Sequence, residues 1–296
     1  MQTTARESGQ FPRYDPNQHY EVDVSDVEYR RDGDQAWLAR VYRPRATGPF
    51  PALVDVHGGA WTMGDRTNNA LMDEGLAATG LVVVALDFRQ APQHAYPAMV
   101  ADVNYGTRWL KAHARDFDAD PRHLGGIGTS SGGHIAMLSA MRPNDPRYRA
   151  LPLAEAPDAD STLAYLFALW PILDPYARYQ FAKDTGRAEL VTRTEGFFLN
   201  EDAMQEGNPQ LILDRGETVQ LPPTFIAQGT ADTNLTMAMT ERLVAAYRKA
   251  GGSIELEQFP GAQHGFGNQP GEDAERLLGL MMAFVARQLQ PVAATA

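Results

Sequence analysis

The five residues Gly128-Thr129-Ser130-Ser131-Gly132 say more about this chain's structure than any other short stretch. They follow a strand-like run and precede a segment of small residues with helical spacing. The pattern G-x-S-x-G is typical of a strained turn from a strand into a helix, with a serine hydroxyl exposed at its tip. Small residues are needed on both sides because the helix crowds the turn. The stretch therefore predicts that Ser130 is an exposed nucleophile.

A second glycine motif, His57-Gly58-Gly59-Ala60-Trp61, lies upstream and also follows a strand-like run. Such a loop can aim backbone N–H groups at one point, where they stabilise an oxyanion in a transition state. We expect Gly58, Gly59 and Ser131 to supply these donors, with Ala60 as a further one. A plain Gly-Gly turn is the alternative. Each motif alone is weak because short patterns recur by chance, but together they predict a serine hydrolase.

Strand-like and helix-like segments alternate along most of the chain. The run Leu81-Val82-Val83-Val84-Ala85-Leu86 is typical of a central parallel strand covered on both faces. The other expected strands are residues 51–56, 123–128, 162–169, 222–227 and 254–259, and the helices are residues 69–78, 98–114, 132–141, 236–250 and 272–289. An antiparallel hairpin at 26–30 and 36–42 precedes them. This order predicts an α/β fold with a mostly parallel sheet flanked by helices.

A serine hydroxyl needs a base to accept its proton and a carboxylate to orient that base. In chains with this turn, the order is serine, acid, histidine. Asp232 and His264, the only histidine after that acid, directly follow two successive expected strands. Both thus fall at the sheet edge where open α/β sheets bind ligands. We expect Ser130, Asp232 and His264 to form a catalytic triad; Asp174 is the alternative acid, and Asp232 could instead be a helix N-terminal carboxylate.

The composition narrows the classes of function. The chain has 296 residues, of which 44% are apolar and 21% charged, as expected for one large globular domain. Its net charge of -11 disfavours nucleic-acid binding, which needs clustered Lys and Arg. The absence of cysteine excludes thiolate catalysis, and no histidine–carboxylate spacing predicts a metal or another cofactor. The polar start and the lack of a long apolar run predict a cytoplasmic protein without membrane contact.

These motifs resemble those of α/β-hydrolases, in particular the hormone-sensitive-lipase-like group of bacterial esterases. The similarity extends from about Pro51 to the end of the last expected helix. It rests on the two glycine motifs, on the Asp232 and His264 loops, and on the stretches Asp87-Phe88-Arg89-Gln90-Ala91-Pro92 and Tyr96-Pro97-Ala98 with Asp102. The chain departs from the family pattern at Ala60, Thr129 and Thr233, where glycine, an acidic residue and proline are usual.

The resemblance implies a single hydrolase domain over residues 1–296 that cleaves carboxylic esters through an acyl-enzyme. It also implies a cap built from residues 1 to about 22 and 172 to about 220. A homodimer formed through an edge strand is an analogy with the family. The glycine loop with Trp61 is also similar to that of kynurenine formamidases, so an aryl formamide or other activated amide is the alternative substrate. A non-catalytic binding protein with this fold is a third hypothesis, which the intact triad disfavours.

Residues 172–220 break the strand–helix rhythm and are rich in aromatic side chains. Connections of this length are uncommon in a compact sheet and often act as lids. Since ligand sites are mostly apolar, we expect aromatic side chains to roof Ser130 and bind the acyl or alcohol part of a small-molecule substrate. The residues concerned are Trp61, Trp170, Tyr176, Phe197 and Phe198. A small satellite core is the alternative.

Overall fold

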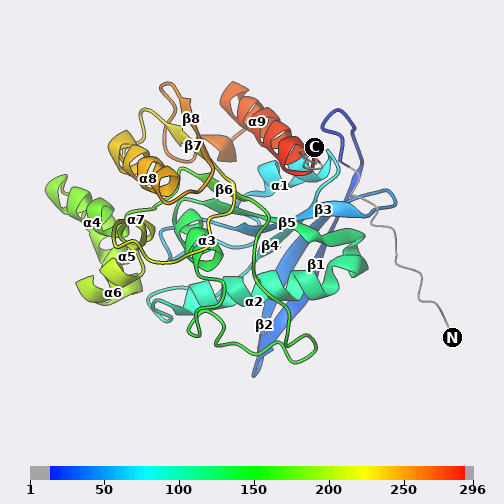
Figure 1. Ribbon diagram of the computed structural model, residues 1–296, viewed down its shortest axis with the longest axis horizontal. Helices are drawn as coiled ribbons and strands as arrows, with labels where there is room; N and C mark the ends of the chain where they lie inside the picture. The colour runs from blue at the N-terminus through cyan, green and yellow to red at the C-terminus, as the bar shows by residue number, and fades with distance from the viewer. Residues whose placement is uncertain (1–13, 291–296) are drawn as a thin grey trace.

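The computed structural model describes residues 14–290, which are built around one eight-stranded sheet (Figure 1). The strands are β1 (Val22–Asp32), β2 (Gln35–Pro44), β3 (Phe50–Val56), β4 (Val82–Leu86), β5 (Ala119–Thr129), β6 (Leu166–Leu169), β7 (Thr224–Gly229) and β8 (Ile254–Phe259). Their order in the sheet is β1-β2-β4-β3-β5-β6-β7-β8. β2 is antiparallel to both of its neighbours, and all later pairs are parallel. The predicted fold class, a mostly parallel sheet in an α/β-hydrolase arrangement, is confirmed.

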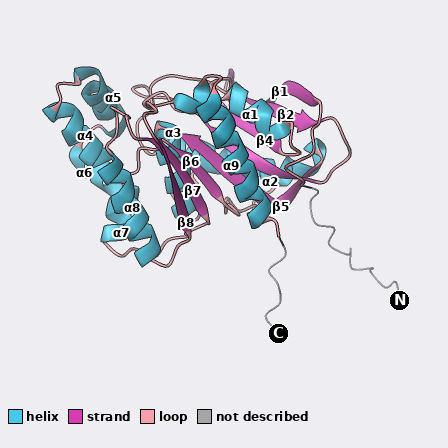
Figure 2. Ribbon diagram, turned by 90° about the horizontal axis from the view of Figure 1, so that it is seen from above, coloured by secondary structure: helices cyan, strands magenta, loops and turns pink. Residues whose placement is uncertain are grey.

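Helices cover both faces of this sheet (Figure 2). These helices are α1 (Ala70–Ala77), α2 (Ala98–His113), α3 (Ser131–Met141), α8 (Met237–Lys249) and α9 (Glu272–Gln288). Val54 and Val84 point to one face and share a core cluster with α2, α3 and α8. Their neighbours Leu53 and Val83 point to the other face and pack with α1 and α9. Because successive strand residues face opposite sides, the continuous apolar run in β4 is what a doubly covered sheet requires.

The segment expected to form a lid contains four short helices and no strand. They are α4 (Pro175–Asp184), α5 (Ala188–Phe198), α6 (Glu201–Glu206) and α7 (Pro209–Asp214). In Figure 1 they gather beside α8, and α7 contacts both α3 and α8. Two 3-10 helices, η1 (Ala114–Phe117) and η2 (Phe266–Asn268), lie outside this group. The other expected strands and helices are present with shifted ends; β6, for example, begins at Leu166 rather than at residue 162.

The N-terminal part of the expected cap is not beside the serine. In its described part, residues 14–21, Tyr20 donates from its backbone N–H to a carbonyl just after α1 (2.8 Å). The Tyr20 ring meets Phe50 edge-on, with 5.6 Å between the centroids. Phe50 opens β3, so this segment packs at the amino edge of the parallel strands, opposite to Ser130. The remaining residues of that expected cap, 1–13, lie outside the described residues.

Candidate active site

Ser130 occupies the turn between β5 and α3. Its backbone torsions, φ 53° and ψ −117°, lie in a region that residues with a side chain rarely adopt. A Cβ on Gly132 would lie 2.0 Å from the carbonyl oxygen of Val56, and one on Gly128 would lie 2.6 Å from the carbonyl oxygen of Gly132. Glycine is therefore required on both sides of the serine. The Ser130 N–H donates to the carbonyl of Leu169 (2.9 Å) and ties the turn to β6.

His264 and Asp232 lie beside Ser130, on the loops that follow β8 and β7. His264 Nε2 is 2.9 Å from Ser130 Oγ, and His264 Nδ1 is 2.8 Å from Asp232 Oδ2. An ionised carboxylate only accepts hydrogen bonds, so Nδ1 carries the proton and Nε2 accepts from the serine hydroxyl. The three side chains expected as a triad are thus within hydrogen-bond reach, in the order that acyl transfer needs.

The second oxygen of Asp232 fixes the carboxylate in place. Oδ1 accepts from the backbone N–H groups of Asn234 (2.8 Å) and Leu235 (3.1 Å). The carboxylate therefore closes a turn just before α8, which begins at Met237, and it is not the N-cap of that helix. Its side chain is only 1% exposed, so its orientation toward His264 is set by the backbone around it.

Asp174, the alternative acid, has a structural role. It is the N-cap of α4, where its Oδ1 accepts from the backbone N–H of Ala177 (3.0 Å) and from Asn208 Nδ2 (2.8 Å). Its Oδ2 pairs with Arg242 (3.1 Å). Since Asn208 is itself the N-cap of α7, these bonds fix the starts of two helices. None of them reaches the triad histidine, so the interpretation of Asp174 as the triad acid is wrong.

The glycine loop, residues 57–61, leads from β3 to the nucleophile. A Cβ on Gly58 would lie 3.2 Å from the Cβ of Ser130, so the loop backbone and the serine are direct neighbours. Gly59 has a φ of 112°, and a Cβ there would lie 1.9 Å from the carbonyl oxygen of Met63. Only glycine fits this position. The loop amides are therefore close to the place where an oxyanion on Ser130 would form.

Ala60 and Trp61 continue the loop with positive φ values of 50° and 64°. Ala60 replaces the third glycine of the family pattern and keeps its backbone donor. The Trp61 N–H donates to Ser131 Oγ (3.1 Å), which ties the loop to the start of α3. As the first helical residue, Ser131 has a backbone N–H with no partner inside the helix, so this amide is able to donate to an oxyanion formed beside Ser130.

His57 supports the loop from the protein interior. Its Nδ1 donates to the carbonyl of Gly58 (2.7 Å), and its ring stacks on Phe88 with 4.3 Å between the centroids. Burial lowers the pKa of His57, which keeps the ring neutral at neutral pH. This agrees with a bracing role and not with that of a base.

A buried polar cluster lies under the glycine loop. Asp55 in β3 accepts from Asn69 Nδ2 at 2.9 and 3.1 Å, and Asn69 Nδ2 is also 3.4 Å from Thr129 Oγ1. Both carboxyl oxygens of Asp73 are buried without a hydrogen-bond partner among the described residues. Burial raises the pKa of Asp55 to about 7, and burial with repulsion from Asp55 raises that of Asp73 well above its usual range. Sequence reasoning missed this cluster, although an aspartate in an otherwise apolar strand was a usable signal.

Three of the aromatic residues expected to roof the serine are instead inside the protein. Trp61, Phe197 and Phe198 are 1%, 0% and 1% exposed. The rings of Trp61 and Phe197 stack with 5.0 Å between centroids, and Phe198 meets Phe197 edge-on at 4.7 Å. Tyr96 and His134 complete this aromatic cluster. The prediction that these three residues bind substrate is wrong, because they form the satellite core that fastens α5 to the glycine loop.

His134 links the aromatic cluster to α3, the helix that begins directly after Ser130. Its Nδ1 accepts from Trp61 Nε1 (3.2 Å), and its Nε2 donates to the carbonyl of Gly207 (2.7 Å). Burial lowers the pKa of His134 to about 4, so the ring stays neutral and can accept and donate at once.

Of the two other residues expected to bind substrate, Tyr176 and Trp170, only Trp170 lines the cavity beside Ser130. Tyr176 is half-buried on α4, its hydroxyl donates to Glu201 (3.5 Å), and it does not line the cavity beside Ser130. This part of the prediction is also wrong. Trp170 follows β6 with a positive φ of 38° and does line that cavity.

The serine cavity has a volume of about 240 Å³ and opens beside Ser130 and His264. Its wall consists of Gly58, Gly59, Ala60, Met63, Asn68, Asn69, Thr129, Ser130, Trp170, Arg178, Leu190, Arg193, Asn234, His264, Gly265 and Asn268. Arg178 and Arg193 were not predicted from the sequence. They lie in residues 172–220, where no sequence pattern indicates which side chains face the sheet and the serine. These two arginines give the cavity a more polar wall than the expected aromatic roof.

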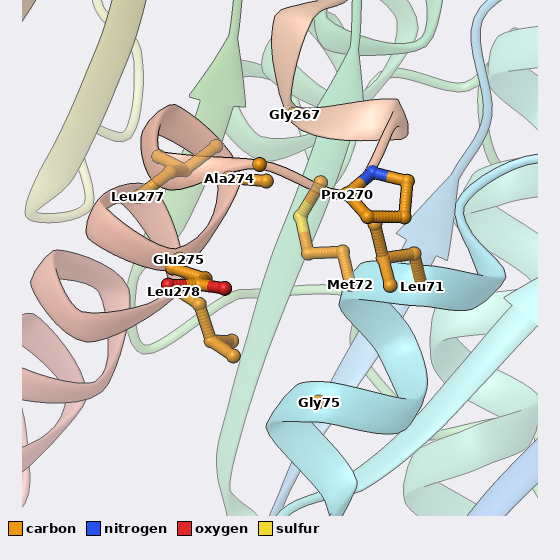
Figure 3. A pocket seen from close by; sticks show the side chains of 10 residues that line it. Leu71, Met72, Gly75, Gly267, Pro270, Ala274, Glu275, Leu277 and Leu278 are labelled. Carbon is orange, nitrogen blue, oxygen red and sulfur yellow. The ribbon is translucent and has the colours of Figure 1, made fainter.

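A separate apolar cavity of about 200 Å³ lies between α1 and α9. Figure 3 shows Leu277 and Leu278 of α9 facing Leu71 and Met72 of α1 across it. Glu275 is its only ionisable lining residue. Neither Ser130 nor His264 lines this cavity.

The BD-FAE family model matches residues 40–247. The chain belongs to this family. The matched span contains the glycine loop, Ser130 and Asp232, and His264 follows it in the sequence.

Similar proteins include esterase LipC of Mycobacterium tuberculosis, which is 31% identical over 248 residues, covering 79% of this chain and 58% of LipC. Carboxylic ester hydrolase LipN of the same organism is 29% identical over 262 residues, covering 86% of this chain and 66% of LipN. The chain spans 56% of the probable carboxylic ester hydrolase LipM and 59% of esterase LipQ from that organism. It thus matches less than two thirds of these relatives.

Among solved structures, esterase Est2 of Thermogutta terrifontis with butyrate bound superimposes with a TM-score of 0.70 at 25% identity. The match covers 91% of this chain and 94% of Est2. Esterase B of Lactobacillus rhamnosis has a TM-score of 0.75 at 19% identity, covering 93% of this chain and 87% of that one, which supports the fold alone.

Within residues 14–290, no helix combines the length and the apolar character needed to cross a bilayer. In the same part of the chain, no group of three or more His, Cys, Asp or Glu side chains is placed to hold a metal ion.

Proposed function

We propose that this protein is a serine hydrolase that cleaves carboxylic esters through an acyl-enzyme intermediate. The observation that carries the proposal is the bridge made by His264, 2.9 Å from Ser130 Oγ and 2.8 Å from Asp232 Oδ2. A histidine between a hydroxyl and a buried carboxylate is the arrangement that activates a serine. The relatives named as esterases and carboxylic ester hydrolases support an ester as the substrate.

In the first half of the reaction, Ser130 Oγ attacks the carbonyl carbon while its proton moves to His264 Nε2. The imidazolium that forms is stabilised by Asp232, which keeps its own negative charge. The resulting tetrahedral intermediate then collapses: its bond to the alcohol oxygen breaks, and His264 returns the proton to that oxygen. The alcohol leaves, and the acyl group remains bonded to Ser130.

The negative oxygen of the tetrahedral intermediate is stabilised by backbone donors. We assign this role to the N–H groups of Gly58, Gly59 and Ser131, with Ala60 as the further donor. Loss of one such donor typically costs about 2.7–4 kcal/mol of transition-state stabilisation. Gly58 supports this assignment because its backbone adjoins Ser130, where a Cβ would be only 3.2 Å from the serine Cβ.

In the second half, water takes the place of the alcohol. His264 Nε2 accepts a proton from the water as its oxygen attacks the acyl carbon, and a second tetrahedral intermediate forms. His264 then returns the proton to Ser130 Oγ as the acyl–oxygen bond breaks. The carboxylic acid leaves, and the starting enzyme is restored.

The proposal is tested with a short 4-nitrophenyl ester and a fluorophosphonate probe. Wild type should cleave the ester and gain one probe adduct at Ser130 by mass spectrometry. Ser130→Ala should lose activity by about 10⁴-fold or more and lose the adduct. Ser139→Ala, a buried serine on the same helix, is the matched control and should keep both. A wild-type protein that neither turns over nor is labelled would support the non-catalytic hypothesis instead.

An amide substrate is the second candidate, motivated by Trp61 after the glycine loop. The Trp61 side chain is 1% exposed and packed on Phe197, so it offers no contact that would favour an amide. We therefore propose the ester. Turnover of N-formylkynurenine that exceeds that of phenyl acetate would reverse this choice.

A cytoplasmic location, a small-molecule ester or amide as the substrate, the lack of nucleic-acid and membrane binding, and a homodimer stay predictions. Cell fractionation tests the first, and light scattering of the purified protein tests the last.

A further inference from the structure

Arg178 is the most deeply buried cation of the serine cavity. It is 2% exposed, and the only hydrogen bond that its side chain donates within residues 14–290 runs from Nη1 to Thr194 Oγ1 (2.9 Å). Its Nε is buried without a partner among the described residues. The guanidinium lies over the Trp61 ring, 5.7 Å from the ring centroid, and so rests on the aromatic cluster. A cation held in this way is costly unless another group uses its free donors.

A second arginine lines the same cavity. Arg193 on α5 donates from Nη1 to Thr62 Oγ1 (3.1 Å), and its side chain is 21% exposed. It also pairs with Glu189, but that carboxylate is 74% exposed, and such surface pairs contribute little. Arg193 therefore places a second guanidinium at the cavity wall, while its ion-pair partner Glu189 is not among the lining residues.

The cavity has no matching negative charge of its own. No Asp or Glu is among its described lining residues, although the chain as a whole has a net charge of -11. The nearby triad acid, Asp232, stabilises Arg178 through space, but its oxygens already bind His264 and two backbone amides. Burial, together with Arg187 and Arg193, lowers the pKa of Arg178 to about 10, which still leaves it charged at neutral pH. The wall beside the nucleophile is thus positively charged.

The chemistry of the free donors points to one kind of ligand. Since Nη1 of Arg178 is used by Thr194, the donors of the guanidinium that are unused among the described residues are the parallel N–H groups of Nε, which is buried, and of Nη2. Such a pair of donors matches the two oxygens of a carboxylate. We propose that Arg178 and Arg193 form an anion-binding subsite of the serine cavity, and that the preferred ester carries a carboxylate near the scissile bond. This rests on the proposed ester hydrolysis and adds the substrate class.

Two substrate pairs test the subsite, each with an anionic ester and a neutral one of similar length. Mono(4-nitrophenyl) adipate against 4-nitrophenyl 6-oxoheptanoate places the charge on the acyl side. 4-Acetoxybenzoate against 4-acetoxyacetophenone places it on the alcohol side. The measured quantity is the ratio of kcat/KM for the anionic ester to that for the neutral one, after subtraction of the spontaneous rates. Comparing this ratio between variants cancels differences in intrinsic reactivity.

In Arg178→Gln the ratio for one of the two pairs should fall about 10- to 100-fold, the range that a hydrogen bond to a charged group supplies. The pair that responds identifies the side of the ester that carries the carboxylate. Arg178→Lys keeps the charge and should restore part of the ratio. Arg193→Gln should lower it by about threefold, as expected for a partly exposed cation. Arg287→Gln, which removes the same charge from the exposed side of α9, is the control and should leave the ratio unchanged.

The subsite proposal is overturned if neither ratio changes by more than about twofold in folded Arg178→Gln and Arg193→Gln. If Arg178→Gln does not fold, Arg193→Gln decides in its place. A second measurement does not depend on turnover: calorimetry of adipate binding to Ser130→Ala, with and without Arg193→Gln. Binding that is absent, or equal in both proteins, also refutes the subsite. Hydrolysis of neutral esters with unresponsive ratios rejects the subsite alone, whereas failure of ester hydrolysis and of probe labelling rejects the proposed function.

Discussion

Replacing Asp73 with asparagine tests the buried polar cluster under the glycine loop. Asp73 is 0% exposed, and both of its carboxyl oxygens lack hydrogen-bond partners among the described residues. Asn69 satisfies the neighbouring Asp55 with two hydrogen bonds, so Asp55 is the better placed of the two to hold a negative charge. Asp73 is then held protonated, and asparagine has nearly the shape of that neutral form.

The expected effect follows from proton linkage. The pKa of Asp73 is raised by burial above its ordinary value of 3.8, so the folded state binds more protons than the unfolded state once the pH exceeds 3.8. Stability is then lost as the pH rises, by about 1.4 kcal/mol per pH unit, until the folded-state pKa is reached. Asp73→Asn removes this loss. Its stability relative to wild type should therefore increase as the pH rises above 5, by at most about 1.4 kcal/mol per pH unit.

Urea unfolding of both proteins at several pH values between 5 and 7 measures this difference. Glu74→Gln, on the exposed side of the same helix, removes one carboxylate outside the cluster and serves as the control. Free energies of unfolding that run parallel for wild type and Asp73→Asn across this range would mean that the Asp73 carboxyl ionises normally. The account of the buried cluster given above would then be wrong.

Three further outcomes are expected. Phe197→Ala should lower the free energy of unfolding by about 3–5 kcal/mol in urea titrations, because it empties a packed position; a loss below about 1 kcal/mol would contradict that packing. Gly59→Ala places a Cβ 1.9 Å from the carbonyl of Met63, so 4-nitrophenyl ester hydrolysis should fall at least 100-fold, about the effect of losing one oxyanion donor, and near-normal turnover would exclude this loop from the oxyanion hole. Asp232→Asn should lower kcat by about 10⁴-fold, and a loss within tenfold would place the acid elsewhere.

The sheet and the triad geometry could be anticipated because their signals are local. β4 is a continuous apolar run, and Asp232 and His264 each follow a strand directly, so parallel alignment brings both to the edge where Ser130 lies. The order serine, acid, histidine along the chain then leaves few candidate residues for the acid and for the base. The single wrong alternative, Asp174, also follows a strand, and only its bonds to α4 and α7 reveal its capping role.

The helices of residues 172–220 and the cavity wall could not be anticipated in the same way. Two helix starts were in fact marked in the sequence, since Asp174-Pro175 and Asn208-Pro209 each pair an N-cap residue with proline at the first helical position. The sequence does not indicate which side chains of these helices are buried and which line the cavity. Phe197 is buried and Arg193 lines the cavity because of how α5 packs on the glycine loop, which depends on residues far away in the sequence.

The inner side of α5 contacts both the glycine loop and the serine cavity. This has a practical consequence for redesign of the substrate preference. Its last turn is fastened to the glycine loop through Phe197 and Phe198, whereas its first half presents Leu190 and Arg193 to the serine cavity. Side chains at 190 and 193 can therefore be exchanged for others of different size or charge while the anchor of the helix stays intact. New substrate preferences are then within reach of single substitutions that leave Phe197 and Phe198 in place.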